Sequence, residues 1–269
     1  MRFAALLLAC AGCALPAVTA GTFLPAGDLK PGDLHASASL EVGRVLAGPA
    51  DVHDLTATPP DARQYDVSTW FASDLSLRWM ATSRISLEGQ LKLTDAVSPL
   101  TPALAGGALG VRVRLKDRSP EGGLALELAA RAVGVSVQQT ITRTAGSRSQ
   151  VDTWDYRSLG LELPLVVTYR VNSLFAVTGA PFVRAYWIRA WHDEHTTTVA
   201  SDGTSTVTFD QAALQWTPVL SAGIGGSLAL DLGPLQIAPG LALELATRPG
   251  PNTPTHLLFE PGLSVGTRF

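Results

Sequence analysis

The densest group of titratable side chains is the run His192-Asp193-Glu194-His195. Imidazole nitrogens and carboxylate oxygens bind divalent metals, so the run has the residue types of a metal site. On a β-strand, however, His192 and His195 point to opposite faces, and joint ligation would need a turn between them. We therefore expect a solvated surface loop here and no metal site.

Two other histidines stand beside groups that occur in hydrolytic sites. His35-Ala36-Ser37 places an imidazole and a hydroxyl two residues apart, a pair suited to acyl transfer. A strand would turn both toward the same enclosed side, which favours a polar interior pair instead. His53-Asp54 has no serine arranged as a nucleophile beside it, and no phosphate loop, dinucleotide fingerprint or metal-thiolate motif occurs. We expect no catalytic residue and no cofactor.

The segment around His53 is acidic and stiffened by proline. Its aspartates are Asp51, Asp54, Asp61 and Asp66, and its prolines are Pro49, Pro59 and Pro60. Such a segment is either a contact for a ligand or cation, or an acidic surface loop that is simply solvated.

The composition excludes several classes of protein. The 269 residues are 46% hydrophobic and 16% charged, with a net charge of −3. A near-neutral chain has no basic footprint for nucleic acid, and this apolar content is too high for a disordered chain. Both cysteines, Cys10 and Cys13, lie near the start of the chain. If that segment is removed, the mature protein has no thiol, disulfide or cysteine metal ligand.

The first twenty residues have the features of a secretory signal peptide. Arg2 precedes an apolar run, Phe3 to Leu15, that is too short to span a membrane, and small residues precede Gly21. We place the cleavage after Ala20, which leaves residues 21–269 as a single domain. A lipoprotein signal with cleavage before Cys10 is the alternative, since Leu7-Leu8-Ala9-Cys10 is similar to a lipobox.

Beyond the leader, apolar and polar residues alternate with a period of two, the pattern of a β-strand with one apolar face. Such runs predict ten strands, although eight or twelve remain open. The predicted ranges are 34–46, 67–80, 85–96, 107–117, 124–141, 157–170, 174–191, 205–231, 235–247 and 256–269.

The connections between these runs alternate in length. Tight gaps follow the second, fourth, sixth and eighth runs, and longer gaps, which include 142–155 and 192–204, follow the others. Hairpins with short turns at one end and long loops at the other describe an up-and-down meander. The fifth run changes parity near Val133–Val135, which we interpret as a bulge.

Within each run, the positions that alternate with the apolar ones carry charged residues, and over all runs the two signs are equal in number. If the sheet closes into a barrel, these side chains point into the lumen and neutralise one another there. The expected lumen charges are Glu41, Asp74, Arg78, Glu88, Lys92, Arg112, Arg114, Glu127, Arg131, Glu162, Arg170, Arg184, Asp231, Glu244, Glu260 and Arg268. Ten strands enclose little more space than eight, so we expect a plugged lumen or a thin water path.

Aromatic residues of the apolar parity stand at the strand ends, as the two girdles of a membrane barrel do. Phe71, Trp187, Trp216 and Phe259 are expected at the long-loop end, and Trp79, Tyr169, Phe175 and Phe269 at the short-turn end. The ten steps from Phe259 to Phe269 extend about 33 Å, or about 24 Å of membrane depth at a 45° tilt. A soluble β-sandwich shares the alternation but does not need these girdles.

Together these features resemble the bacterial outer-membrane β-barrel family. The most specific part is the last strand, Gly262 to Phe269, which looks like the family's terminal assembly signal. The resemblance implies that Leu263, Val265 and Phe269 are read by the outer-membrane insertion machinery. It also implies a location in the outer membrane of a Gram-negative bacterium, periplasmic termini and short turns, and long loops at the cell surface.

One enzymatic resemblance competes with a non-enzymatic role. Asp193 and His195, in the fourth surface loop, are similar to one half of the omptin protease site. That family also uses an Asp-x-Asp pair on the second loop, where this chain offers only Asp95.

We therefore predict an all-β, closed, antiparallel up-and-down transmembrane barrel with an ion-paired lumen and surface loops. The expected partner is outer-membrane lipid, with a surface ligand bound through the long loops as an option, and no nucleic acid. Its expected role is structural or surface interaction rather than catalysis. A narrow, porin-like channel for small solutes and a hydrolase at the rim are the alternatives.

Overall fold

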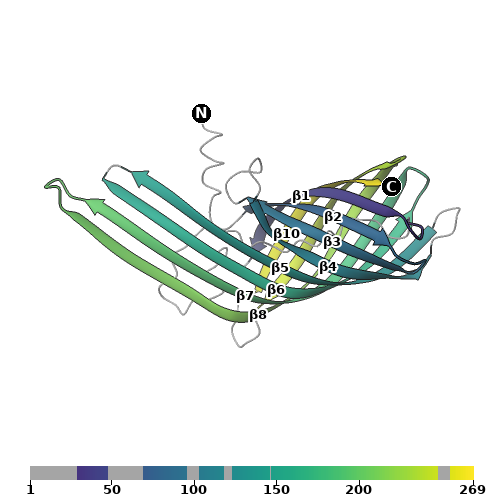
Figure 1. Ribbon diagram of the computed structural model, residues 1–269, viewed down its shortest axis with the longest axis horizontal. Helices are drawn as coiled ribbons and strands as arrows, with labels where there is room; N and C mark the ends of the chain where they lie inside the picture. The colour runs from purple at the N-terminus through teal and green to yellow at the C-terminus, as the bar shows by residue number, and fades with distance from the viewer. Residues whose placement is uncertain (1–28, 48–68, 96–102, 118–122, 146, 248–254) are drawn as a thin grey trace.

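The computed structural model describes residues 29–47, 69–95, 103–117, 123–145, 147–247 and 255–269. The predicted signal peptide, His53-Asp54 and the acidic first segment lie outside this part of the chain. The fold is all-β, as predicted, with ten strands that close into a barrel (Figure 1). The strands are β1 (Leu34–Ala47), β2 (Thr69–Met80), β3 (Ile85–Asp95), β4 (Ala103–Lys116), β5 (Gly123–Ala145), β6 (Arg148–Arg170), β7 (Phe175–Val199), β8 (Ser205–Leu232), β9 (Leu235–Thr247) and β10 (Thr255–Arg268).

Every strand pairs antiparallel with its neighbours in sequence, and the seam between β1 and β10 closes the ring. At this seam, the backbone N–H groups of Leu34 and Phe269 donate to each other's carbonyl oxygens at 3.2 and 2.9 Å. Closure removes free strand edges, which a membrane requires because lipid offers no hydrogen bonds to backbone groups. The meander topology inferred from alternating gap lengths is therefore confirmed.

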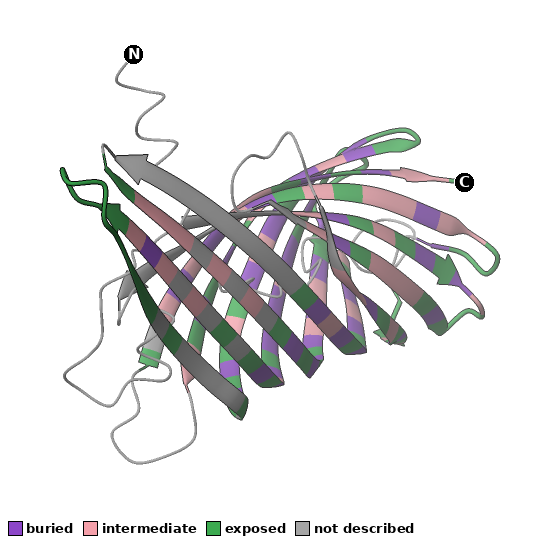
Figure 2. Ribbon diagram, turned by 60° about the vertical axis from the view of Figure 1, so that its left-hand side comes forward, coloured by how far each residue is buried: buried purple, intermediate pink, exposed green. Residues whose placement is uncertain are grey.

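In the barrel body, side chains alternate between an inner face that is largely buried and an outer face that is largely exposed (Figure 2). On β3, for example, Ser86 and Lys92 are buried, whereas Leu87 and Leu91 are exposed. This arrangement inverts a soluble protein, because the apolar side chains face outward. Exposed leucine and valine side chains around a closed sheet are suited to lipid rather than water.

The strands β5 to β8 continue well beyond the rim of the barrel (Figure 1). The last pairs that join them to the rest of the wall are Val135 with Gly106 of β4 and Leu220 with Thr247 of β9. Residues 136–145, 147–157 and 188–219 form a four-stranded extension that we call the wing. Its two hairpins meet through pairs that run out to Arg148 and Thr198.

The wing corrects the predicted connections 142–155 and 192–204. Both were expected as long loops, but most of their residues belong to strands, and the β7–β8 turn spans only residues 200–204. The Asp202-Gly203 turn is tight, with Gly203 at a φ of 83° that favours glycine. The prediction was wrong because a sheet with water on both faces has no apolar parity to reveal it.

The predicted bulge at Val133–Val135 was also wrong. The β4–β5 and β5–β6 registers run through these residues without a shift, and both valines are buried on the inner face. The parity change in the sequence reflects apolar residues that pack inside the barrel. Register shifts occur instead at Val45/Ala47, Lys92/Leu93, Arg114/Lys116 and Ile188/Ala190.

Candidate functional site: the barrel interior and the wing

All sixteen charged residues expected in the lumen lie on the inner face of the strands. Thirteen whole residues are largely inaccessible, and the side chains of Glu88 and Arg114 are almost so; only Arg268 is partly open, with 29% of its side chain exposed. Eight are arginine or lysine and eight are aspartate or glutamate, so formal charge balances. Buried charges are costly unless paired, so their partners decide what the interior can do.

Eight of these side chains form one connected series of ion pairs across the interior. In order, the series is Arg78, Glu127, Arg112, Glu88, Arg131, Glu162, Arg184 and Glu244. Arg78 contacts both oxygens of Glu127 at 2.9 Å, and Arg112 contacts Glu88 at 2.9 Å. Since Arg78 lies on β2 and Glu127 on β5, these bonds join strands that are not neighbours in the wall and therefore reach into the lumen.

Two smaller groups flank this series. The Lys92 ammonium lies 3.3 Å from Asp74, which also accepts a hydrogen bond from the Gln90 amide at 2.8 Å. Near the short-turn end, Asp231 contacts the guanidinium groups of Arg170 and Arg268 and accepts from Gln236. Fourteen of the sixteen lumen charges thus take part in ion pairs with one another.

Large side chains fill space that inner-face glycines leave free. The nearest atom of the Tyr186 ring is 2.2 Å from the position that a Cβ on Gly160 would take, too close for any side chain there. The Phe182 ring lies in the same way against Gly223. His35 packs against Gly266, and the guanidinium carbon of Arg184 lies 4.1 Å from the Phe182 ring centroid. One cavity beside Ser76, Glu88 and Arg131 has about 20 Å³, space for about one water molecule. His35 and Ser37 therefore belong to a packed interior.

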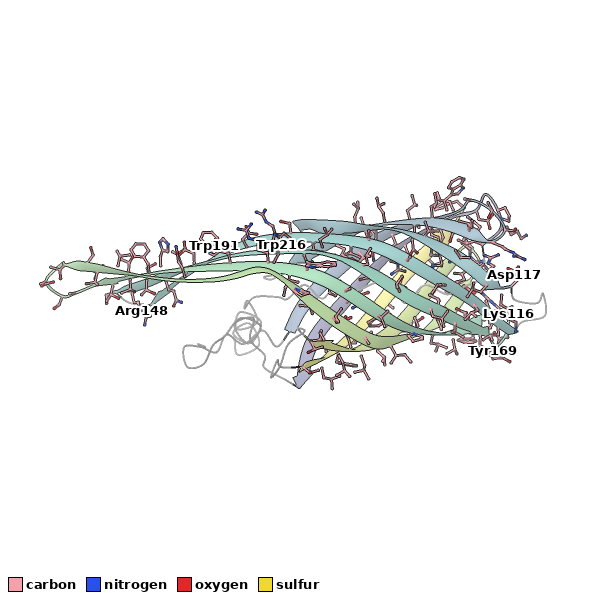
Figure 3. The ribbon with its side chains drawn as sticks, turned by 90° about the horizontal axis from the view of Figure 1, so that it is seen from below. Lys116, Asp117, Arg148, Tyr169, Trp191 and Trp216 are labelled. Atoms are coloured by element: carbon pink, nitrogen blue, oxygen red, sulfur yellow. The ribbon has the colours of Figure 1, made fainter. Side chains whose placement is uncertain are left out.

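The outer wall is apolar, and its aromatic residues point outward. Trp79, Tyr169, Phe175 and Phe269 are exposed near the short-turn end, as are Trp187 and Trp216 near the base of the wing; Phe259 is half-buried. In Figure 3, Tyr169 lies at the same end of the barrel as Lys116 and Asp117, and Trp191 and Trp216 lie toward the wing. Phe71 lies in β2, but its side chain is outside the described set. Leu263 and Val265 of the terminal strand are also exposed on the outer face.

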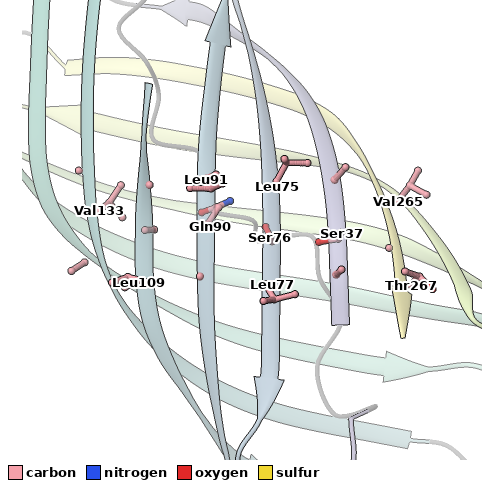
Figure 4. A pocket seen from close by; sticks show the side chains of 18 of the residues that line it. Ser37, Leu75, Ser76, Leu77, Gln90, Leu91, Leu109, Val133, Val265 and Thr267 are labelled. Carbon is pink, nitrogen blue, oxygen red and sulfur yellow. The ribbon is translucent and has the colours of Figure 1, made fainter. Parts of the chain in front are cut away.

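A hollow of about 970 Å³ lies in the outer wall across β1 to β5 and β10 (Figure 4). Small residues such as Ala36, Gly89 and Gly107 leave it open, between exposed leucines such as Leu75 and Leu109. Its lining is almost wholly apolar. The few polar residues along it include Ser37, Gln90 and Thr267, and an apolar hollow on a lipid-facing wall suits apolar groups better than polar ones.

Asp193 and His195 lie on the wing, on the same face as the exposed outer wall. His195 Nε2 is 3.0 Å from Asp193 Oδ2, and its ring meets the Phe209 ring edge-on at 4.6 Å. The Gln211 amide donates to the other Asp193 oxygen at 3.3 Å. His192 and Glu194 fall in the same strand, β7, rather than in the surface loop that was expected.

Asp95, the other acid considered for a protease site, lies at the end of β3, which does not pair with β7. Among the described residues, no group of three or more His, Cys, Asp or Glu side chains is placed to hold a metal ion. In the same residues, there is no helix of the length and apolarity needed to cross a membrane.

The closed ring, the charged and packed interior, and the apolar outer wall with aromatic ends together define a transmembrane β-barrel of the bacterial outer-membrane type. No protein-family model matches the sequence, and no curated protein matches it either.

Among solved structures, the chain is similar to the outer membrane protease OmpT from Escherichia coli, with 11% identity over 90% of this chain and 98% of that one, and a TM-score of 0.45. It is also similar to Ail, the attachment invasion locus protein of Yersinia pestis, with 11% identity over 89% and 99% of the two chains and a TM-score of 0.33. The N-terminal β-barrel domain of OprF from Pseudomonas aeruginosa matches at 11% identity over 90% and 100%, with a TM-score of 0.28. At identities this low, the similarity is one of fold alone.

The wing is the structural feature that the sequence pattern did not reveal. Its strands carry β-branched and aromatic residues, for example in the run Thr196 to Val199 and in Val207 and Phe209. β-propensity without apolar alternation was the available signal for a strand in water.

Proposed function

We propose that this protein is a non-enzymatic outer-membrane barrel whose closed body anchors the wing at the cell surface as an interaction element. The observation that carries the proposal is the contrast between a lumen filled by cross-strand ion pairs and a four-stranded sheet that leaves the membrane. A lumen filled by ion pairs suits a barrel that only holds the protein in the membrane. The wing presents polar and aromatic side chains to the outside.

The packing of the interior argues against a channel. Conduction needs a continuous path lined by groups that ions can reach. Here the central charges are bonded to each other, for example Arg112 to both Glu88 and Glu127, and Tyr186 and Phe182 occupy the space over inner glycines.

The arrangement of the wing argues against a rim hydrolase. Asp193 holds His195 as the acid of a catalytic pair would, but the histidine ring packs on Phe209 on the outward face. A hydrolytic site also needs a nucleophile or an activated water beside the base. No described serine or second acid is hydrogen-bonded to His195.

Planar-bilayer conductance of the purified, refolded chain tests the closed lumen. We expect no discrete steps from a barrel whose folding is checked by its shift in gel mobility on heating. The double variant Arg78→Ala/Glu127→Ala removes two lumen-filling side chains and serves as a control that should conduct if it folds. Stable steps from the unmodified chain would overturn the anchor proposal in favour of a channel.

The surface role is tested by shortening the wing. Removal of residues 138–155 and 192–213, each replaced by a two-residue Asn-Gly turn, trims the two hairpins above the rim. Bacteria that display the trimmed barrel should insert as much folded protein but lose the cell–cell or cell–surface attachment that the full chain gives. Equal attachment by both forms would contradict an interaction role for the wing.

A further inference from the structure

Among the residues that the structure describes, the outermost strand of the wing, β8, has one edge without a partner strand, called here its free edge. From Leu220 toward the short-turn end, β8 pairs with β9, but from Ser205 to Val219 it pairs only with β7 among the described residues. An unpaired strand edge presents a row of backbone donors and acceptors, and the chemistry that complements such a row is another extended backbone.

The hydrogen-bond register shows which residues point their backbone groups outward. The Val199 N–H donates to Ser147 on the β6 side, and the Ala200 N–H donates to Thr204. Even-numbered residues of β7 therefore face β8, so that Thr206 and Thr208 of β8 bond to Thr198 and Thr196. The backbone groups of Val207, Phe209 and Gln211 are consequently directed to the free edge.

The same residues present exposed side chains on the outer face of the wing. Val207 is 46% exposed and Phe209 is 65% exposed, and Gln211 beside them is also exposed. A partner strand placed along β8 would set its own alternate side chains against this apolar pair.

This edge lacks the usual protection against strand pairing. Natural edges carry lysine or proline, or are twisted away by bulges. The segment Ser205 to Ala213 has no lysine, arginine or proline, and its single charge is Asp210. The register shift opposite Ile188/Ala190 and Pro218 come only at the base of the wing.

We propose that the β8 edge from Ser205 to Ala213 binds an extended, uncharged strand of another protein, which adds to the wing as a fifth antiparallel strand. This rests on the proposed surface role. A second copy fits less well, because two copies inserted with the same polarity bring their β8 edges together in parallel, the weaker pairing. Pairing of β8 with β5 of a second copy would be head to tail and would grow into open arrays.

The probe is a fluorescein-labelled peptide, Lys-Thr-Val-Thr-Val-Thr-Val-Lys, whose uncharged core of six residues represents the partner strand and whose terminal lysines keep it soluble. It is titrated with the refolded full chain in detergent micelles and followed by anisotropy. We expect saturable binding that falls by about tenfold or more in Val207→Pro and Phe209→Pro. Each proline removes an edge-facing N–H but no bond to β7, so the wing is retained. Phe209→Thr keeps the N–H and is the matched control, and a peptide N-methylated at alternate residues should not bind.

Equal affinity of the proline variants, or no saturable binding to the unmodified chain, would overturn the inference. Light scattering on the same samples separates the occupants: dimers or arrays that Val207→Pro abolishes would assign the edge to a second copy instead. If the barrel shows no conductance steps and does not bind the peptide, only the inference about the β8 edge is overturned. If the barrel conducts, the proposed function is overturned, whatever the result of the peptide titration.

Discussion

The barrel body uses all ten strands and the wing only β5 to β8, so these four strands pass through two different surroundings. In the body, lipid lies outside and the polar side chains turn inward, where Arg131 and Arg184 join carboxylates from several strands. In the wing, the outward face carries Asp193, His195 and the exposed pair Arg157 and Asp155. The same strands therefore change their chemistry at the membrane boundary, with one register shift there, in the β7–β8 pair.

The two regions also differ in what an ion pair contributes. The Arg78–Glu127 pair is almost completely buried, and each partner would be left charged in the interior if the other were removed. The Arg157–Asp155 pair is exposed to water, which screens it and leaves it little net effect on stability. Substitutions at matched positions should separate the two regions clearly.

The largest difference is expected from removing one buried carboxylate. Glu127→Ala leaves Arg78, Arg112 and Arg114 without a shared partner, and should lower the free energy of unfolding by about 3–5 kcal/mol. The measurement is urea unfolding of the refolded barrel in detergent, followed by tryptophan fluorescence. Asp193→Ala on the wing should cost about 1 kcal/mol or less. Similar losses for the two variants would show that the lumen pairs do not hold the body together.

A second contrast uses the outer face alone. Leu109, near the middle of β4, and Val207 on the wing are both exposed, but only Leu109 lies on the lipid-facing wall. In lipid vesicles, Leu109→Arg should destabilise the barrel by about 2–4 kcal/mol, because a guanidinium enters the hydrocarbon. Val207→Arg should change the unfolding free energy by about 0.5 kcal/mol or less. If Leu109→Arg leaves the unfolding free energy unchanged, the hydrocarbon of the membrane does not contact this part of the wall.

The body was predictable from the sequence because lipid imposes the period-two pattern. Residues such as Leu87 and Leu91 had to be apolar and Glu88 and Lys92 could be charged, so parity alone located strands and the inner face. The exceptions arise where the interior itself is apolar. Val133 and Val135 pack inside, so parity misplaced a bulge there.

The wing was hidden for the converse reason. Residues 142–155 and 192–204 lie beyond the closed ring of the barrel, and a sheet there that meets water on both faces, as the proposed placement implies, needs no apolar face. Sequence reasoning also could not specify partners in the lumen. Arg78 and Glu127 are 49 residues apart and lie on non-neighbouring strands, so their contact depends on barrel curvature rather than on local pattern.

Interior packing gives a third, smaller contrast. Gly160→Val would place a side chain where the Tyr186 ring lies, and Gly179 on β7 has nothing within 4 Å of its Cβ position. We expect Gly160→Val to cost about 1–3 kcal/mol through overpacking, beyond the change seen for Gly179→Val. The temperature at which the folded band disappears in a gel series measures both. Matching values would mean that Tyr186 can leave the interior freely.

The smallest effect is expected at the tip of the wing. Asp202 accepts hydrogen bonds from the Thr204 N–H at 2.9 Å and the Thr204 hydroxyl at 2.6 Å, and these bonds hold the pKa of Asp202 below its ordinary value. A lowered folded-state pKa stabilises the turn above the ordinary aspartate pKa, and this stabilisation is lost as the pH falls through the lower folded value. The protection of the amides of residues 200–204 against hydrogen exchange, taken relative to the intrinsic exchange rate at the same pH, should therefore fall under acidic conditions, and only there.

Asp202→Ala should abolish that acid-dependent step while the exchange of β3 and β10 in the body stays unchanged. Asp202→Asn keeps an acceptor oxygen without a titrating group, so it should retain the slow exchange at every pH. An acid step that survives in Asp202→Asn would assign the titration to another group of the wing. The turn would then be held by its backbone geometry, with Gly203 rather than Asp202 as its determinant.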